Sequence, residues 1–489
     1  MLTRVTAYAL GFAVLWILLQ LVRAPKPRQI LLLMASYLFY ASWGPRFLGL
    51  LILSSVVNFA LGRYLQQRPT VGRLWIGIAF NLLLLATFKY LPPLAASMPD
   101  KSGVLELFRS IVLPLGISFW TFEALGYLFD VYREQELDPT LLEFCLFMAF
   151  WPTVFAGPIC RLRELLPQFR STAFSSLQDV GTGMQRIFTG VFMMALARVL
   201  GQGVSGHGLD AGFAMTPSRW SGLDVWCLIL GYGFELFFDF AGYSHVVIGA
   251  AQVMGFRLPE NFQTPYLSLS PSAFWTRWHM SLSFWIRDYL FLPLVMLRRE
   301  AAWRLFTLFL SMVVFGLWHK ASWTFLLWGA YQGLLLVIHR QWQQLRMRTS
   351  IAVPEYVATP VAWGFTYIAV SLGWILFRSA DLAQASAMLE AVFSPSTYSS
   401  RLLPKSLYLL AAAAGIGYFV VVGIARLLTS MAEREELSGS HLQGTAGWSF
   451  LLQDRWVWVA PLAIVLSLYG FFALHPEQAK VAPMLYRLF

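Results

Sequence analysis

The histidines set in apolar sequence are the residues with the clearest chemical potential. Four of the seven lie within or beside apolar segments: His245, His279, His319 and His339. His319 separates two strongly apolar stretches, in the run FGLWHKASWT at positions 315–324. A histidine there can be buried in a membrane yet reached from a cavity, and its neutral imidazole can accept a proton from a hydroxyl nucleophile. The alternative for each histidine is a structural role, bonding a neighbouring helix.

A second group of polar residues lies in the aromatic run 274–290. At helical spacing one face carries a stripe formed by Trp275, Trp278, Leu282, Trp285 and Tyr289. A neighbouring face carries His279 and Ser283, and another carries Arg277, Ser281 and Asp288. The tryptophans fit core packing or an interfacial belt. For His279 and Arg277, a role in lining a ligand passage competes on equal terms with packing.

The composition indicates that a membrane surrounds these residues. Of 489 residues, 58% are hydrophobic and 12% are charged, against about 25% charged residues in soluble domains. A soluble globular enzyme does not fit this composition. The net charge of +11 comes from basic residues dispersed through short loops, which fits an anionic membrane surface better than nucleic acid. The three cysteines lack CxxC spacing, so neither a disulfide framework nor a zinc site is expected.

The apolar stretches predict an all-α polytopic bundle of roughly 11–14 transmembrane helices. The expected spans lie near 1–23, 30–43, 47–61, 74–91, 111–129, 141–159, 178–200, 223–254, 302–318, 322–338, 361–377, 406–424 and 457–474. We expect one membrane-embedded domain over 1–489, with a core of about 28–474 and a C-terminal tail at 475–489.

Two segments depart from simple spans. Residues 223–254 are too long for one perpendicular span and combine four glycines with Glu235, Asp239 and His245. This favours a tilted, broken or paired element that lines a polar cavity, because ionisable groups in lipid are costly. Residues 272–295 are too polar to face lipid, which favours an amphipathic or re-entrant helix pair buried against the bundle.

The charges of the loops predict how the chain is oriented in the membrane. Basic clusters that should be cytoplasmic by the positive-inside rule lie at Arg23–Arg28, Arg63–Arg73, Arg161–Arg170, Arg298–Arg304 and Arg340–Arg348.

The sequence has no HExxH, no GxSxG elbow, no Walker loop and no Rossmann glycine fingerprint. Zinc hydrolysis, nucleotide hydrolysis and dehydrogenase chemistry therefore do not fit.

A set of short motifs follows one another along most of the chain. They are LPLGISFWTFE (113–123), DVYR (130–133), AGPI (156–159), FDFAGYS (238–244), PENF (259–262), PY (265–266), the run from FW to RDYL (274–290), GLWH (316–319) and WG (328–329). In this order they resemble the membrane-bound O-acyltransferase (MBOAT) family, and within it the bacterial branch that includes the alginate O-acetylation proteins. The resemblance extends from about residue 28 to the C-terminus.

The resemblance implies an acyltransferase with helices around a central tunnel. It carries the family's membrane histidine onto His319, with His279 as a second polar residue, and both are expected to be catalytic. An acyl thioester, expected to be acetyl-CoA, approaches from the cytosol, and the acyl group leaves on the extracytoplasmic side. The residues expected to line the tunnel or bind the donor are Arg277, Trp278, Ser281, Arg287, Asp288, Asp239, Tyr243, Trp318 and Lys320.

The chemistry of these residues fits that expectation. A thioester and an acceptor hydroxyl must meet where bulk water is excluded, or hydrolysis competes. A neutral histidine within hydrogen-bond reach can activate the hydroxyl. Arg277, Arg287 and the basic loops are candidates for holding the phosphates of coenzyme A, although loop charge is explained equally well by topology.

The expected setting is a bacterial inner membrane, with an extracytoplasmic polysaccharide such as an alginate-like exopolysaccharide, cellulose or peptidoglycan as acceptor. The expected partners are an extracytoplasmic SGNH-hydrolase-like acetyltransferase, the polysaccharide machinery, acyl-CoA and membrane lipids, but not nucleic acid. No permanently bound cofactor and no metal are expected, and acetyl-CoA serves as the donor.

The C-terminus and three other positions qualify the resemblance. The final run MLYRLF (484–489) resembles the aromatic C-terminal motif of this branch, so Tyr486 is either an acyl relay or an interfacial anchor. Three positions depart from the family pattern: His245 replaces an acidic residue, Lys320 replaces a glycine, and 294–299 replaces a glycine-rich basic turn. These departures leave the histidine chemistry intact, but they put donor preference and partner identity in doubt.

Two other functions remain open from the sequence. One is transfer of D-alanine from a carrier protein to teichoic acid, as related proteins do. The other, from a different class, is a proton-coupled transporter or flippase, which many spans and Asp239 permit but the missing internal repeat weakens.

Overall fold

The computed structural model of the protein is helical. It describes residues 2–99, 103–133, 137–172, 174–203, 206–215, 220–349 and 354–438. Within these ranges every regular element is a helix and none is a strand. The expected all-α class is therefore confirmed. The span expected at 457–474 lies outside the described residues.

Six helical stretches within the described ranges are long and apolar enough to cross a membrane. They are Pro45–Gln67, Val71–Ser97, Gly222–Val253, Ala301–His319, Glu355–Arg378 and Lys405–Leu427. Since about 20 apolar residues span the hydrocarbon of a bilayer, the chain is polytopic, as expected.

Some expected spans are shorter than predicted. The span expected at 111–129 is a helix only over Ile117–Tyr132, and the span expected at 141–159 is a helix only over Leu141–Ala149. Residues 152–160, which follow this second helix, form buried non-helical turns. An apolar turn buried in protein has the same composition as a membrane span, so hydropathy does not separate them.

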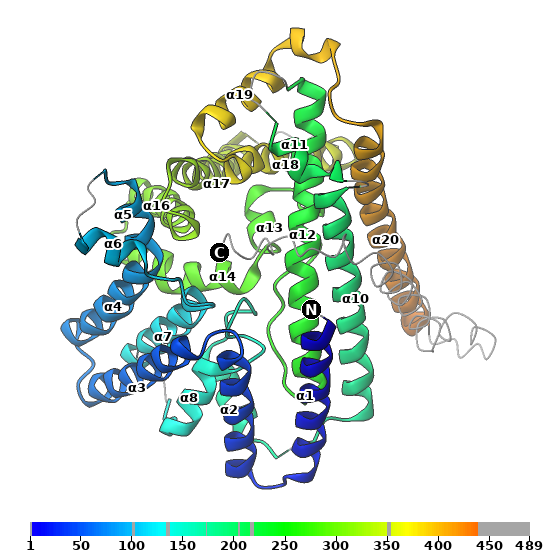
Figure 1. Cartoon of the computed structure of the whole chain (residues 1–489). Coiled ribbons are helices and arrows are strands. Elements are labelled where there is room, and N and C mark those ends of the chain that lie inside the picture. The colour runs from blue at the N-terminus through cyan, green and yellow to red at the C-terminus, as the bar shows by residue number, and fades with distance from the viewer. Residues whose placement is uncertain are drawn as a thin grey trace. The chain divides into compact units, whose positions relative to one another are not determined.

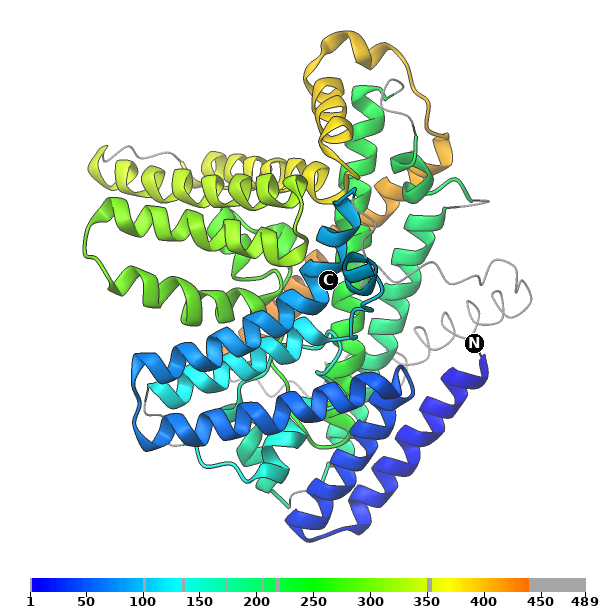
Figure 2. The same cartoon turned by 60° about the vertical axis from the view of Figure 1, so that its left-hand side comes forward.

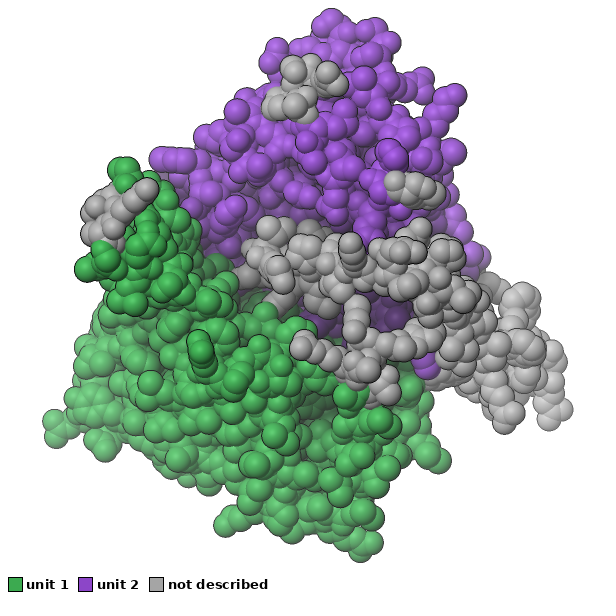
Figure 3. Space-filling model, viewed as in Figure 1, with its two compact units in different colours: residues 1–187, 247–260, 281–290 green, residues 188–246, 261–280, 291–489 purple. Residues whose placement is uncertain are grey.

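The described chain divides into two compact units, coloured separately in Figure 3. Unit 1 comprises residues 1–187, 247–260 and 281–290. Its helices are α1 (Leu2–Leu21), α2 (Pro25–Ala41), α3 (Pro45–Gln67), α4 (Val71–Leu85), η1 (Ala86–Tyr90), α5 (Leu91–Ser97), α6 (Gly103–Arg109), α7 (Ile117–Tyr132), α8 (Leu141–Ala149), α9 (Leu162–Arg170), most of α14 (Met280–Ile286) and η5 (Arg287–Phe291), with the start of α10 (Leu177–Gln202) and the end of α12 (Gly222–Val253). The single domain expected over 1–489 stays a prediction.

The core of unit 1 is built around α7, which is buried along almost its whole length and packs against α3 and α4. Two residues of the aromatic stripe predicted from the sequence form hydrogen bonds here. The indole of Trp285 donates a hydrogen bond to the carbonyl oxygen of Phe122 at 2.9 Å, and the hydroxyl of Tyr289 donates to Asp130 at 2.8 Å.

Unit 2 comprises residues 188–246, 261–280 and 291–489. Besides the rest of α10 and α12, its helices are α11 (Leu209–Phe213), η4 (Pro265–Leu267), α13 (Pro271–Trp275), α15 (Leu292–Met296), α16 (Ala301–His319), α17 (Trp323–Thr349), α18 (Glu355–Arg378), α19 (Leu382–Phe393), η6 (Pro395–Ser399) and α20 (Lys405–Ser438). Figure 2 shows α16, α17 and α18 as a layer of neighbouring helices.

The hairpin of α16 and α17 is a closely packed helix pair of unit 2. A Cβ added at Gly316 would lie 3.0 Å from the Cα of Gly329, and one added at Gly329 would lie 2.5 Å from the carbonyl oxygen of Met312. Small residues allow helix backbones to approach this closely in a membrane. The glycines of the GLWH and WG motifs therefore fix the end of α16 against α17.

The element expected at 223–254 is one unbroken helix, α12, which runs beside α10 (Figure 1). Its glycines permit close packing and do not interrupt it: a Cβ at Gly242 would lie 2.7 Å from the carbonyl oxygen of Gly190 on α10. Most of the span is buried inside the protein, so Glu235 and Asp239 can lie in it without meeting lipid. A broken or paired element is therefore not what the structure contains.

The segment expected as a helix pair at 272–295 consists of short helices. After α13 and α14 the helix widens into the π-helix η5, and Pro293 follows directly at the start of α15. A proline ring collides with the carbonyl four residues earlier, here that of Tyr289, and a wider turn relieves the collision. The same arrangement recurs at η1, which is followed by Pro92 and Pro93.

Candidate active site

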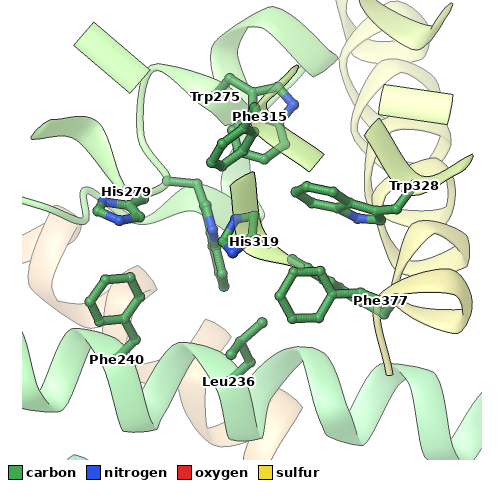
Figure 4. Close-up of a pocket in the computed structure, with 10 residues that line it drawn as sticks. Leu236, Phe240, Trp275, His279, Phe315, His319, Trp328 and Phe377 are labelled. Atoms are coloured by element: carbon green, nitrogen blue, oxygen red, sulfur yellow. The ribbon is translucent and has the colours of Figure 1, made fainter. Parts of the chain in front are cut away.

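A small enclosed cavity lies among the helices of unit 2 (Figure 4). It is lined by Leu236 and Phe240 of α12, Trp275 of α13, Trp278 and His279 of the turn before α14, Phe315 and His319 of α16, Trp328 of α17, and Trp374 and Phe377 of α18. Its volume of about 10 Å³ is room for about one water molecule. Among these lining residues the two histidines are the titratable ones, and the others are aromatic or aliphatic.

The cavity lies near the middle of a membrane span. Leu236 and Phe240 follow Gly222, the first residue of α12, by 14 and 18 residues, and the helix ends at Val253. At about 1.5 Å per residue, each end of α12 is roughly 20–27 Å from the cavity. A group in the cavity is thus far from both ends of this span.

His319 is the last residue of α16 and is 4% exposed. Its ring is surrounded by aromatic rings, with centroids 4.7 Å from Phe315, 5.4 Å from Trp328 and 5.4 Å from Phe377. Figure 4 shows the imidazole in the centre of this group. The next residue, Lys320, is exposed, so the chain turns outward directly after the histidine.

His279 reaches the cavity from a strained turn. It is 2% exposed, and its φ of 43° lies in the left-handed region that non-glycine residues rarely adopt. Its ring meets Phe240 edge to face, with centroids 4.7 Å apart. Burial lowers the pKa of His279 from 6.5 to about 3, so the imidazole is neutral at physiological pH.

The structure brings together three of the residues predicted for the site and distributes the others elsewhere. His319, His279 and Trp278 line the cavity. Trp318 contacts the His319 ring, with centroids 4.7 Å apart, from outside the lining. Arg277, Asp239 and Tyr243 are half-buried and Lys320 is exposed, and none of these four is among the lining residues. Their roles stay predictions.

Three further predicted residues belong to a polar cluster in unit 1. Ser281 accepts a hydrogen bond from the backbone of Ile159 at 3.0 Å. Asp288 forms ion pairs with Arg161 and with Arg287. Although burial raises the pKa of Asp288, hydrogen bonds from Arg287 and Arg161 outweigh it and hold the pKa below its ordinary value. Asp288 is therefore ionised at neutral pH.

Sequence reasoning missed most of the cavity wall and part of this cluster. Leu236, Phe240, Trp374 and Phe377 line the cavity from α12 and α18, and each pair is spaced by three or four residues on one helix face. That spacing is visible in the sequence, but lipid-facing residues of a membrane helix show it too. Tyr486, the expected relay, lies outside the described residues.

The cavity combines two buried imidazoles with an aromatic surround. A neutral histidine in such a place can accept a proton from a hydroxyl and then release it to a leaving group. Within the described ranges, no group of three or more His, Cys, Asp or Glu side chains is placed to hold a metal ion. The arrangement suits acid and base chemistry on a group that is shielded from water.

A family model described as MBOAT, the membrane-bound O-acyltransferase family, matches residues 69–378. The chain belongs to this family. The matched range includes every residue that lines the cavity. The protein is thus a multi-pass membrane acyltransferase.

Relatives of this acyltransferase carry related activities. It is 36% identical over 381 residues to a probable alginate O-acetylase AlgI of Pseudomonas putida, which covers 75% of each chain. It is 31% identical over 415 residues to a peptidoglycan O-acetyltransferase of Helicobacter pylori, covering 78% of this chain and 77% of the relative. It is also 34% identical over 253 residues to a teichoic acid D-alanyltransferase of Streptococcus thermophilus, covering 50% of this chain and 60% of the relative.

Proposed function

We propose that this acyltransferase moves an acetyl group from cytosolic acetyl-CoA across a bacterial inner membrane, for O-acetylation of an extracytoplasmic polysaccharide. The observation that carries the proposal is the pair of buried histidines in an aromatic cavity near the middle of α12. Similarity over three quarters of the chain to an alginate O-acetylase, and to a peptidoglycan O-acetyltransferase, supports the acetyl group and the polysaccharide.

His319 acts as the general base in this proposal. Its imidazole takes the proton of the acceptor hydroxyl while the hydroxyl oxygen attacks the thioester carbonyl carbon. The bond from carbon to sulfur then breaks, and the thiolate of coenzyme A leaves and takes up the proton. The packed rings around His319 keep bulk water away, so the acyl group passes to the hydroxyl and not to water.

The cavity must widen for this reaction, because it holds about one water in its present form. Trp278 and the other lining aromatic residues would move apart to admit the two reacting groups. His279, which also lines the cavity, would orient one of them through its neutral imidazole.

The donor's phosphates would bind at the arginines of unit 1. The side chain of Arg287 is 54% exposed beside Asp288, and Arg133 is exposed and donates to the backbone oxygen of Asp288 at 2.7 Å. Arginine side chains hold phosphates through several N–H groups at once. The segment that contains Arg161 and Arg163, at the start of α9, is expected to face the cytosol, where coenzyme A is found.

On the extracytoplasmic side, an SGNH-hydrolase-like acetyltransferase and the polysaccharide machinery would complete the transfer. Tyr486 would relay the acyl group to that partner, with an interfacial anchor as the alternative role. A change of Tyr486 to Phe separates these, since unchanged acetylation would leave only the anchor.

The test of the proposal is His319→Ala in the full-length, membrane-inserted protein. We expect loss of polymer acetylation, by about 100-fold or more for removal of a general base. The measurement is mass spectrometry of the envelope polysaccharides from cells with the wild type, the variant and no protein. Near-normal acetylation with His319→Ala would reject the assignment.

A second function is favoured by one observation, the similarity to a teichoic acid D-alanyltransferase over half of the chain. In that case the donor is an aminoacyl group on the phosphopantetheine of a carrier protein. Saturable binding of acetyl-CoA by the purified protein supports acetyl transfer, whereas a strict requirement for a carrier protein supports the second function.

A further inference from the structure

The turn that carries His279 is hydrogen-bonded to a neighbouring non-helical segment, residues 261–263. The backbone N–H of Met280 donates to the carbonyl oxygen of Asn261 at 2.9 Å, and the N–H of Gln263 donates to the carbonyl oxygen of Arg277 at 3.0 Å. These two hydrogen bonds flank His279 on both sides. The turn is thereby fixed to residues 261–263, which run antiparallel to it.

The side chain of Asn261 ties this assembly to α12. Asn261 is fully buried, and its Nδ2 donates to the hydroxyl of Ser244 at 3.1 Å. One turn earlier on the same helix, Phe240 meets the ring of His279, as Figure 4 shows. The backbone of His279 is therefore connected to α12 through Asn261. Its imidazole contacts the same helix through Phe240.

The backbone of His279 needs such support. A non-glycine residue is disfavoured in the left-handed region and persists there where the surrounding structure over-determines it. With φ at 43°, His279 is under this strain. Strained residues of this kind cluster at functional sites, because a fixed orientation serves the chemistry.

We propose that Asn261 and Ser244 are positioning residues for acyl transfer, which hold His279 in its left-handed conformation so that its imidazole lines the same cavity as His319. The inference rests on the proposed function, because it assumes that the cavity is where the acyl group is transferred. Neither residue lines the cavity, so both act through His279.

The ionisation of His279 provides a readout that a general loss of stability would not imitate. Burial holds its pKa at about 3. The charged and titratable groups on the elements packed around it include Glu235, Asp239 and His245 of α12, Glu260 next to Asn261, Arg277 of its own turn and His319 of α16. If the turn loosens and admits water, the pKa of His279 should rise toward about 6.5. The imidazole then becomes protonated as the pH falls below about 6.5, and the rate falls there.

The experiment compares the full-length wild type with Asn261→Ala, Ser244→Ala and the double variant in inverted membrane vesicles. The initial rate of coenzyme A thiol release from acetyl-CoA is measured against acetyl-CoA concentration at pH 5 to 8. We expect kcat to fall about 10- to 100-fold, as for a misplaced catalytic group, with KM for acetyl-CoA changed less than about threefold. We also expect a new acidic limb in the pH profile of each variant.

The double variant and a matched control complete the test. If the two side chains act as a pair, the double variant loses no more activity than either single variant. The control is Asn81→Ala, which removes another fully buried asparagine whose Nδ2 donates to Asn58 at 2.6 Å in unit 1. It should lower thermal stability without adding an acidic limb.

The proposal is overturned if Asn261→Ala and Ser244→Ala keep the wild-type pH profile, or if Asn81→Ala produces the same acidic limb. Additive losses in the double variant would overturn the pairing as well. Failure of the proposed function is a separate result, because it is read from full activity of His319→Ala, whatever the Asn261 variants do.

Discussion

At the residue scale, the two cavity histidines differ in how the chain presents them. His319 ends a regular helix, so its place follows from helix geometry and from the rings around it. His279 depends on a strained turn that other residues must hold. We therefore expect acyl transfer to be sensitive to substitutions around His279, because loss of one hydrogen bond releases the strain stored in its turn.

A second residue-scale consequence concerns Glu143 and Arg170, which form a two-point ion pair at 2.7 and 2.9 Å in unit 1. Hydrogen bonding from Arg170 lowers the pKa of Glu143 to about 2, against the opposing effect of burial and with help from Thr140. An unfolded glutamate has a pKa of about 4.3. The pair therefore stabilises the fold above about pH 5, and this stabilisation is lost as the pH falls toward 2.

We expect Glu143→Gln to cost about 2 kcal/mol at pH 7. The measurement is thermal unfolding in detergent at pH 7, 5 and 3, where the gap from wild type should narrow with falling pH. Glu106→Gln is the control, since its ion pair with Arg109 leaves the glutamate 60% exposed and should contribute little. A gap that is independent of pH would contradict the assignment.

At the element scale, the hairpin of α16 and α17 decides where His319 lies. The backbones approach at Gly316 and Gly329, one helical turn before the histidine. The GLWH motif thus combines the reacting group with the residue that sets its distance from the next helix. The sequence alone supplies the glycine, but its function becomes visible only when the neighbouring helix is known.

We expect Gly316→Ala to push α16 away from α17, since its Cβ would lie 3.0 Å from the Cα of Gly329. The expected cost is about 1–3 kcal/mol of overpacking, and at least about a tenfold loss of acyl transfer as His319 shifts. Gly364→Ala on α18 is the matched control, because nothing lies within 4 Å of a Cβ there. Thermal unfolding and the rate of thiol release are the measurements, and equal effects of the two changes would refute the packing argument.

At the scale of the whole molecule, the central fact is that α12 is both the most buried of the six candidate spans and the helix with the cavity near its middle. If the proposed acyl transfer takes place in this cavity, the donor can approach from one side of the membrane and the acceptor from the other. This is the property that acyl transfer across a membrane requires, because the two substrates never need to share a compartment.

The proposed transfer from a cytosolic donor predicts that the activity is sided. Acetyl-CoA added outside sealed inverted vesicles, whose outer face is the cytoplasmic face, should be turned over, whereas acetyl-CoA added outside sealed right-side-out vesicles should not. Detergent should equalise the two preparations. The measurement is thiol release before and after permeabilisation, and equal rates in both sealed preparations would contradict a cytosolic donor.

The sequence by itself determined the class of the molecule. Long apolar stretches require helices in lipid, since only internally hydrogen-bonded elements can cross it, and the GLWH run marked His319 because polar groups in such stretches are costly. His279 could also be selected, from its place beside Arg277 in an aromatic run. Core packing or an interfacial belt was the interpretation of the stripe's tryptophans, and Trp285 packs in the core of unit 1, where its indole donates to Phe122.

Only the tertiary structure decided which polar residues share the cavity. Arg277, Asp239 and Lys320 do not line the cavity, and their roles stay predictions. The lining includes Phe240 of α12 and Trp374 and Phe377 of α18, rings that hydropathy treats like any other membrane-helix residues. Likewise, glycines that suggested a broken α12 instead let it pack against α10. The physical reason is that burial against protein and burial against lipid select the same apolar residues. Position along the chain therefore cannot distinguish the two kinds of burial. Only the contacts between distant segments distinguish them.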